Sequence, residues 1–346
     1  MHGKIALEEA FNLPRIAATA RATNAALYIR PDRVEEYETE IVDILARVKH
    51  ADNTGVGYTI CSHTVPGVQG ERDPQKAKSL ATEVNDWIAD QIKDHRDKLG
   101  SFATLSMHDP KQAANELRRC VTRYGFHGAL LNNWQLATGS TGEENILFYD
   151  QPEYDTFWSV VQELDVPIYL HPSAPQGVLY DMQYKERKYL VGPPLSFAND
   201  VSLHLLGLVT NGVFDRFPRV QVIVGHLGEH IPFDLWRINH WLEDIEKPLG
   251  LNKTCKKTIH EYFKQNIWIT TSGHFSSATL QYCIHQVGAD RILFSVDYPY
   301  ETYEDACQWF DAAEINLTDK VNIGRENAKR LLKHHQYPDA DAPVRS

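Results

Sequence analysis

Short apolar runs alternate along this chain with longer stretches in which apolar residues recur at helical spacing. The short runs are rich in β-branched and aromatic residues, which is typical of strands that are buried on both faces. There are eight of them: IAL (5–7), GYTIC (57–61), FATL (102–105), GALL (128–131), PIYL (167–170), VQVIVG (220–225), IWITT (267–271) and ILFSV (292–296). The pattern therefore predicts eight strands separated by helices.

The stretches of helical period are the expected helices. They cover residues 33–49, 76–95, 110–123, 152–164, 231–245, 275–287 and 302–314, and further helices are expected at about 317–336. At one of them, Asp109 stands directly before Pro110, which is the residue order of a capped helix start.

The alternation of strands and helices implies a parallel sheet that is covered by helices. Eight strands favour closure of that sheet into a (β/α)8 TIM barrel over an open, doubly wound α/β sheet. No GxGxxG motif follows the first run, which further disfavours a dinucleotide-binding fold. A length of 346 residues suits one large domain, although two domains of average size would also fit. We therefore expect a single barrel domain over 1–346.

Two long stretches interrupt the alternation, at about 12–32 and 172–200. Each follows a predicted strand, so in a barrel both would be inserted loops at the C-terminal face, where barrel enzymes have their active sites. Loops of this length are usually either functional or disordered. Their aromatic and apolar content favours ordered loops that cover an active site.

The formal charge of 35 − 46 = −11 disfavours nucleic acid and anionic membranes as partners, although a bound cation would still attract an anionic substrate. The five cysteines form no CxxC pair, which is typical of reduced thiols in a cytoplasmic enzyme. The N-terminus lacks the pattern of a signal peptide, and no run of 18 apolar residues occurs. We therefore expect a cytoplasmic protein.

Polar residues stand at the ends of the predicted strands, which a barrel brings to one mouth. Glu8 ends the first strand, His171 the fifth and Asp297 the eighth. Two carboxylates and one imidazole are able to hold one divalent cation, and their hardness suits Zn, Mn or Mg. A lone histidine or aspartate at a strand end is more commonly a structural cap, so the metal hypothesis depends on the set of three.

The motif VIVGHLGEHIPF (222–233) follows the sixth strand and places His226 three residues before Glu229. Such a pair beside a metal is able to relay a proton or to orient a carboxylate; the alternative is a histidine at a helix start with solvated charges. Arg237 lies further along the same helix. It is a candidate either for an ion pair at the surface or a subunit interface, or for holding a substrate anion.

His63 in CSHTVPGVQG and Asn132 in GALLNNW lie at the ends of the second and fourth strands and are candidate substrate contacts. Phe197 in GPPLSFAND is a candidate aromatic wall of the pocket. No GxSxG elbow occurs, so a serine hydrolase is not expected.

Motifs at the eight strand ends resemble those of the amidohydrolase-related decarboxylases that act on aromatic acids. The matching strings include GKIALEEAF, FATLSMHDP, VPIYLHP, VIVGHLGEHIP, IWITTSGHF and RILFSVDYPYE, and the resemblance covers most of residues 3–336. It implies a TIM barrel of the metal-dependent hydrolase type. The residues that match the family are Glu8, His171 and Asp297 as metal ligands, His226 and Glu229 as a charged relay, Arg237 as an arginine contributed across a subunit interface, and Asn132 beside the substrate.

One position departs from the pattern of many members of this family. Many relatives carry a second metal-ligand histidine two residues after the glutamate that matches Glu8, and this chain has Ala10 there. The same alanine occurs in the fungal branch that acts on dihydroxybenzoate and salicylate, so the resemblance points to that branch. The first strand also lacks the HxH motif of the two-metal hydrolases.

The resulting hypothesis is a carboxy-lyase that holds one divalent metal ion per chain and decarboxylates an ortho-hydroxybenzoic acid. The resemblance implies 2,3-dihydroxybenzoate, converted to catechol and CO2, or else salicylate, with a homodimer or homotetramer as the assembly. Asp297 would carry the proton to the ring carbon, and no organic cofactor is expected because the ortho-hydroxyl supplies electrons. Two alternatives stay open: a metal-dependent hydrolase of a lactone or amide, and a metal-free barrel used for binding.

Overall fold

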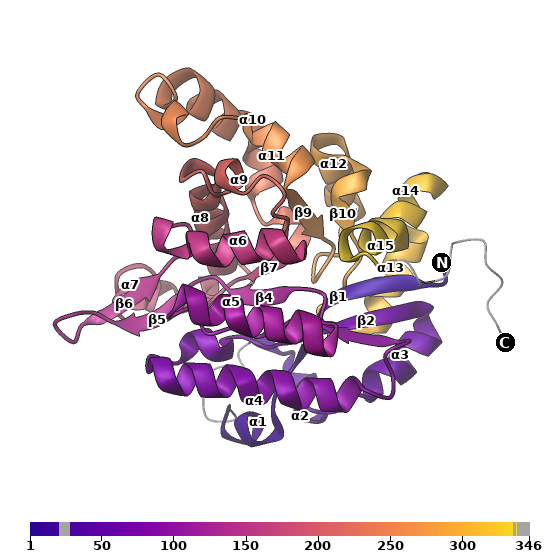
Figure 1. The fold of residues 1–346 in the computed structure, drawn as a ribbon. Coiled ribbons are helices and arrows are strands. Elements are labelled where there is room, and N and C mark those ends of the chain that lie inside the picture. The colour runs from indigo at the N-terminus through magenta and orange to yellow at the C-terminus, as the bar shows by residue number, and fades with distance from the viewer. Residues whose placement is uncertain (21–27, 335–336, 338–346) are drawn as a thin grey trace.

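The computed structural model describes residues 1–20, 28–334 and 337, and eight parallel strands lie at its centre (Figure 1). One sheet joins β1 (Lys4–Phe11), β2 (Val56–His63) and β3 (Leu99–Ser101) in that order. The other has the order β10 (Ile292–Leu293), β9 (Ile267–Thr270), β8 (Val222–Val224), β7 (Ile168–His171) and β4 (Ala129–Asn132). All ladders within these two sheets are parallel.

The two sheets meet at two seams, each marked by one isolated parallel bridge. Leu7 of β1 is bridged to Ser295 just after β10, and Ala103 just after β3 is bridged to Ala129 of β4. The strands therefore succeed one another around a ring in the order of a (β/α)8 barrel, with single bridges instead of continuous ladders at the seams. This arrangement confirms the fold class that the eight apolar runs predict.

Helices surround the strands (Figure 1). Along the chain they are α1 (Pro14–Ala20), α2 (Val34–Glu40), α3 (Ala46–Thr54), α4 (Pro74–Ile92), α5 (Pro110–Arg119), α6 (Asp155–Leu164), α7 (Gly177–Gln183), α8 (Ser196–Thr210), α9 (Val213–Arg216), α10 (Ile231–Trp241), α11 (Ile259–Gln265), α12 (Ser277–Val287), α13 (Tyr303–Ala312), α14 (Leu317–Val321) and α15 (Asn327–Leu332). In the described residues, no helix is both long and apolar enough to cross a membrane.

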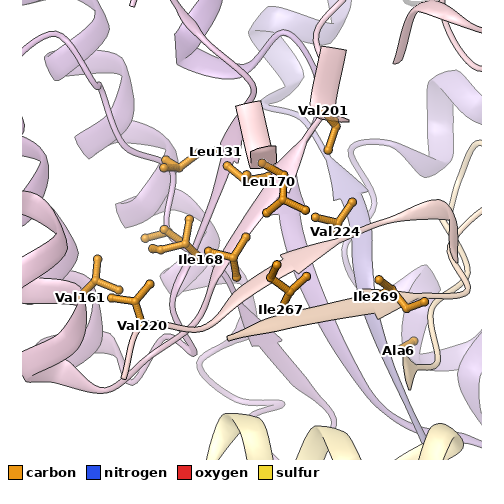
Figure 2. Close-up of a cluster of buried hydrophobic side chains, with 14 of the residues drawn as sticks. Ala6, Leu131, Val161, Ile168, Leu170, Val201, Val220, Val224, Ile267 and Ile269 are labelled. Carbon is orange, nitrogen blue, oxygen red and sulfur yellow. The ribbon is translucent and has the colours of Figure 1, made fainter. Parts of the chain in front are cut away.

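Alternate residues of each strand belong to two different clusters of buried side chains. Tyr169 packs in the inner cluster, whereas its neighbours Ile168 and Leu170 pack in the cluster between strands and helices (Figure 2). Side chains alternate across a strand, and here both faces are buried. This is why the strands read as uninterrupted apolar runs, and it also means that every second residue at a strand end faces the centre of the barrel.

Several predicted boundaries were wrong. The helix expected at 33–49 is two helices, α2 and α3, because the Asp43 carboxylate accepts hydrogen bonds from the backbone of Leu45 and Ala46, both at 3.0 Å, and so opens a new helix. The strand expected at 102–105 lies wholly beyond β3, which ends at Ser101. The expected helix ranges left out α8, and no strands were expected where β5 (Gln135–Thr138) and β6 (Glu144–Leu147) form an antiparallel hairpin.

The two inserted loops contain short helical segments, and the second ends earlier than expected. The first contains α1 and a 3-10 turn at Pro31–Arg33, and its residues 21–27 lie outside the described part of the chain. The second contains α7 and a 3-10 segment at Lys185–Leu190, and it ends where α8 begins at Ser196. Phe197 is therefore a residue of the first turn of α8 and not of a loop.

Candidate metal centre and active site

Four polar side chains from different strand ends converge at the C-terminal mouth of the barrel. Glu8 Oε1 lies 3.4 Å from His171 Nε2, and His226 Nε2 lies 3.5 Å from Asp297 Oδ2. One ligand atom each from Glu8, His226 and Asp297 lie within 4.8 Å of one another. The three residues predicted as metal ligands are thus brought to one site. His226, predicted as a proton relay beside the metal, lies among them, because one of its ring nitrogens belongs to the same group of possible ligand atoms.

The backbone at this site is strained. Of the seven described non-glycine residues with positive φ, two cap helix C-termini, and the other five are Glu8, His226, Leu227, Glu229 and Asp297. A left-handed conformation costs a non-glycine residue about 1–2 kcal/mol, and such strain concentrates at functional sites. The concentration of strain supports a function for this cluster independently of the residue types in it.

A β-bulge directs Glu8 into the site. Ala6 pairs with Thr59 and Glu9 with Cys61, so β1 carries one extra residue between these pairs. Bulges near active sites change the direction in which a side chain points. Here the extra residue lets Glu8 face the centre of the barrel, while the adjacent Glu9 reaches the seam with β10.

The carboxylate of Glu8 is buried and only partly satisfied. The Tyr169 hydroxyl donates to Glu8 Oε2 and lies 2.9 Å from Thr270 Oγ1, whereas Glu8 Oε1 is a buried oxygen without a hydrogen-bond partner. Burial raises the pKa of Glu8 to about 7. An unpartnered buried carboxylate oxygen is costly unless a cation or a donor reaches it, so the residues present fit a divalent ion.

Two glycines leave room around these carboxylates. A Cβ on Gly225 would lie 2.9 Å from Glu8 Oε2 and 3.1 Å from the Tyr169 hydroxyl. A Cβ on Gly273, whose φ is +57°, would lie 3.0 Å from Asp297 Oδ2. Any side chain at either position would crowd the ligand oxygens, so the two glycines form a cradle of the size that an ion or a small polar group needs.

His171 is arranged as a neutral ligand. Burial lowers its pKa to about 4, and its Nδ1 lies 2.9 Å from the carbonyl oxygen of Pro172 and 3.1 Å from Asn132 Oδ1. An imidazole held at Nδ1 by oxygen acceptors presents Nε2 as the lone-pair atom, which is the usual arrangement of a metal-bound histidine. Asn132, predicted as a substrate contact, lies against this ligand and is held in turn by Gln69 at 3.2 Å.

His226 is arranged to carry a proton. Its Nδ1 lies 2.7 Å from Glu229 Oε1, and its Nε2 faces Asp297. Burial works against the charged imidazolium, but the neighbouring carboxylates, Glu229 first among them, outweigh burial and raise the pKa of His226 well above its ordinary value. A histidine held as a cation between two carboxylates suits the relay interpretation of the His–Glu pair better than the solvated helix start.

The other predicted site residues lie at different depths. His63 is buried at the end of β2, where its Nε2 lies 3.4 Å from Asn12 and its Nδ1 has no hydrogen-bond partner, and burial lowers its pKa to about 4. The buried ring of Phe197 lies 6.5 Å from the ring of His171, as a wall of the pocket would. Arg237 is exposed on α10 and lines an outer groove against α8, so this chain does not bring it to the cluster.

The sequence analysis missed Tyr169. It lies inside an apolar strand, where a tyrosine is ordinarily a packing residue, and nothing in its type indicated a hydrogen bond to Glu8. Its position did carry a signal, because Tyr169 precedes His171 by two residues and therefore faces the same side of β7.

Comparison with known proteins identifies the family of the chain. The amidohydrolase family model matches residues 43–333. The γ-resorcylate decarboxylase of Rhizobium sp. (strain MTP-10005) is 40% identical, across 96% of this chain and 99% of that protein. The 2,3-dihydroxybenzoate decarboxylase of Aspergillus niger is 28% identical across 62% of this chain and 100% of that protein.

A solved structure is also similar over nearly the whole chain. It is the dihydroxybenzoic acid decarboxylase of Polaromonas sp. JS666 with bound manganese and the inhibitor 2-nitroresorcinol. The TM-score is 0.89 at 37% identity, and the match covers 97% of this chain and 98% of that one. That protein thus holds a divalent metal on the same fold.

Removal of the hydrogen bond to Glu8 is expected to weaken metal binding. In Tyr169→Phe, Glu8 Oε2 loses its hydroxyl donor and the carboxylate loses its fixed orientation, and partners of metal ligands are typically worth about 10–100-fold in affinity. Titration with Mn²⁺ against a competing chelator measures the effect. Tyr262→Phe is the matched control, because Tyr262 also donates to a carboxylate, Asp215, but does so in the helical layer. Equal Mn²⁺ affinity in the two variants would contradict the prediction.

Proposed function

The chain belongs to the amidohydrolase family, and we propose that it decarboxylates an ortho-hydroxybenzoate at the mouth of its barrel, with 2,3-dihydroxybenzoate as the first candidate. It is a carboxy-lyase that acts on hydroxybenzoic acids, as its relatives of 37–40% identity over nearly their full length are. The observation that carries the detailed proposal is the buried, unpartnered oxygen of Glu8 among His171, His226 and Asp297. The relatives leave the hydrolase alternative without support.

We assign Glu8, His171 and Asp297 as the residues that hold a divalent ion. Carboxylate oxygens and a neutral imidazole suit zinc, manganese and magnesium alike, and the manganese in the Polaromonas structure supports a divalent ion here. When bound, such an ion supplies positive charge for the carboxylate of the substrate and the phenolic oxygen next to it. Phe197 then offers its ring as a wall for the aromatic substrate.

In this proposal Asp297 delivers the proton. Transfer of a proton from its carboxyl group to the ring carbon that bears the carboxylate forms a C–H bond and interrupts the aromatic system. The bond between the ring and the carboxylate then breaks, its electron pair restores the aromatic ring, and CO2 leaves. His226 lies 3.5 Å from Asp297 and is held charged by Glu229, so it is placed to return a proton to Asp297 after each turnover.

Ala10 supports 2,3-dihydroxybenzoate as the substrate. The resemblance drawn from the sequence implies that an alanine here is typical of the fungal dihydroxybenzoate and salicylate branch, and in this structure Ala10 belongs to the same buried cluster as Tyr37. The Tyr37 hydroxyl lies 3.2 Å from that of Tyr300, which lies 2.6 Å from Thr64 Oγ1. We propose that this chain of hydroxyls, beside a small side chain, recognises a second hydroxyl group on the ring.

A second candidate substrate is 2,6-dihydroxybenzoate. It is favoured by sequence identity, because the γ-resorcylate decarboxylases match at 37–40% and the Aspergillus niger 2,3-dihydroxybenzoate decarboxylase at 28%. Both acids carry a hydroxyl group ortho to the carboxylate, so they place the same demand on the metal site. They differ only in where the second hydroxyl must be recognised.

A panel of hydroxybenzoates distinguishes these substrates. Incubation with 2,3-dihydroxybenzoate, 2,6-dihydroxybenzoate, salicylate, 3-hydroxybenzoate and 4-hydroxybenzoate, followed by chromatography of the products, is expected to show fastest turnover of the 2,3-isomer. The ortho acids should exceed the meta and para acids by tenfold or more, about 1.4 kcal/mol of transition-state free energy. Fastest turnover of 2,6-dihydroxybenzoate would replace the first candidate by the second. Equal rates for meta, para and ortho acids would refute chelation through the ortho-hydroxyl.

His226→Asn is expected to lower kcat about 10²–10⁴-fold with little change in KM, because the loss is in proton transfer and not in substrate binding. His127→Asn serves as the control: His127 is, like His226, a partly buried histidine, but it bonds to the Tyr58 hydroxyl at 2.9 Å and lies outside the site. Steady-state kinetics of both variants measure the effect. A rise in KM at unchanged kcat in His226→Asn would make this residue a binding group and would remove the relay.

We also propose that the protein pairs with a second copy of itself through the outer face of α8 and α10. These helices border a groove of about 580 Å³ that is lined by Leu203, Trp241 and Arg237, among others. Large apolar side chains are exposed there, with Leu203 64%, Phe233 78% and Trp236 73% exposed. Patches of this kind mark interfaces. Asp234 and Arg237 lie in the same patch, so a twofold pairing is able to match opposite charges.

Trp236→Glu is expected to convert the assembly to monomers, because two carboxylates would be buried near the centre of a twofold interface. Leu317→Glu is the control, since Leu317 is equally exposed, at 75%, on α14. Size-exclusion chromatography with light scattering gives the mass of each variant. A monomeric wild-type protein, or a Trp236→Glu variant with the wild-type mass, would contradict this interface.

A further inference from the structure

Glu9 is a second buried glutamate beside the site, and all of its carboxylate hydrogen bonds go to one short segment. Glu9 Oε1 accepts from the backbone N–H of Val296 at 3.1 Å and from the hydroxyl of Ser295 at 3.2 Å. Glu9 Oε2 accepts from the backbone N–H of Tyr298 at 3.0 Å. The side chain has no exposed surface. Its two backbone donors stand on either side of Asp297, so the carboxylate spans the residue that we assign as ligand and proton donor.

The hydrogen bonds of Glu9 lie at the seam between β1 and the segment after β10, where the barrel lacks a continuous ladder of backbone hydrogen bonds. The regular strand β10 ends at Leu293, and between β1 and the segment that follows β10 the backbone contributes the bridge of Leu7 with Ser295 and a hydrogen bond of 2.6 Å from Ala10 N to the Tyr298 carbonyl. Interior strand ends are normally fixed by a row of backbone hydrogen bonds. Here a side-chain carboxylate supplies two of the bonds that the row would have made.

The segment needs such support because its backbone is strained. Asp297 has a φ of +81°, and Glu8, on the other side of the seam, has a φ of +70°. Each conformation is unfavourable for a residue other than glycine and persists only if surrounding contacts fix it. Two consecutive residues of β1 therefore have different roles. Glu8 points into the site, and Glu9 binds the segment that carries the carboxylate of Asp297.

We propose that Glu9 is a positioning residue, whose carboxylate fixes the backbone of 295–298 so that Asp297 faces Glu8 at the distance a shared cation requires. The proposal rests on the proposed function only in its assignment of Asp297 as a ligand. Glu9 touches neither substrate nor ion and acts through the segment that it binds.

Glu9→Gln tests the proposal with almost no change in volume. An amide has one acceptor oxygen, whereas the two backbone donors reach two different oxygens of Glu9, so one N–H would face an NH2 group. The expected result is a folded protein whose Mn²⁺ affinity, measured by electron paramagnetic resonance of free Mn²⁺, falls about tenfold or more. Turnover should show the same loss in kcat, with KM for the hydroxybenzoate changed less than threefold.

Glu116→Gln is the matched control for loss of a buried carboxylate. Glu116 accepts from Asn85 at 2.8 Å and from Arg119 at 2.6 Å on α5, outside the site. It should lower the melting temperature while Mn²⁺ affinity stays within twofold of wild type. Mn²⁺ binding requires no turnover, so a protein that decarboxylates none of the acids would refute the proposed function and still test the role of Glu9.

A double-mutant cycle separates positioning from general loosening. If Glu9 acts through Asp297, adding Glu9→Gln to Asp297→Asn should weaken Mn²⁺ binding less than twofold further, because the coupled partner is already lost. A full additional loss would mean that Glu9 acts elsewhere and would overturn the proposal, as would wild-type Mn²⁺ affinity and kcat in Glu9→Gln. If Glu9→Gln does not fold, Ser295→Ala is the variant that tests the proposal, because it removes one of the three hydrogen bonds to the Glu9 carboxylate. A severalfold loss of Mn²⁺ affinity is expected in Ser295→Ala. Wild-type affinity in this variant would overturn the proposal.

Discussion

The carboxylates of Glu8 and Asp297 face each other across the seam of the barrel, and most of the surrounding structure serves to hold them there. Two like charges so close repel, and burial removes the water that would screen them; burial, with a smaller contribution from the charge of Asp297, raises the pKa of Glu8 to about 7. His226 supplies part of the compensating charge, and Tyr169 supplies one hydrogen bond. Glu8 Oε1 still lacks a hydrogen bond, with the His171 ring nitrogen beside it at 3.4 Å, and a divalent cation has the charge and size to bind there.

The fold holds the two carboxylates together because a well-packed barrel lies beneath the strained backbone at the strand ends. The strands are packed on both faces by apolar side chains, and Figure 2 shows part of the cluster on the helix side. Such close packing makes the barrel rigid beneath its mouth. Above that level five residues adopt left-handed backbone conformations, and side chains such as Glu9 replace the missing ladder at the seam. The same arrangement leaves Asp297 and His226 partly exposed, so that a substrate is able to reach them from the mouth.

The sequence predicted the parts of this account that depend on periodicity and failed where a single side chain redirects the backbone. Parallel strands end on one side of a barrel, so Glu8, His171 and Asp297 were expected together without any knowledge of distances. The break at Asp43 and the bulge at Glu8 each depend on one local contact that apolar periodicity does not record. Tyr169 was missed because a tyrosine inside an apolar strand resembles a packing residue. Glu9 stands at the polar end of the first predicted strand, but the sequence does not record the backbone groups that it binds.

The account as a whole depends on one cation bound between the seam carboxylates and His171. The most direct test is a crystal structure of the protein grown with Mn²⁺ and 2-nitroresorcinol, with anomalous diffraction recorded on both sides of the manganese absorption edge. The account predicts one anomalous peak per chain within coordination distance of Glu8, His171 and Asp297, with the aromatic ring beside Phe197. An anomalous peak at other residues would contradict it, as would the absence of a peak at this site in crystals of protein that is fully active.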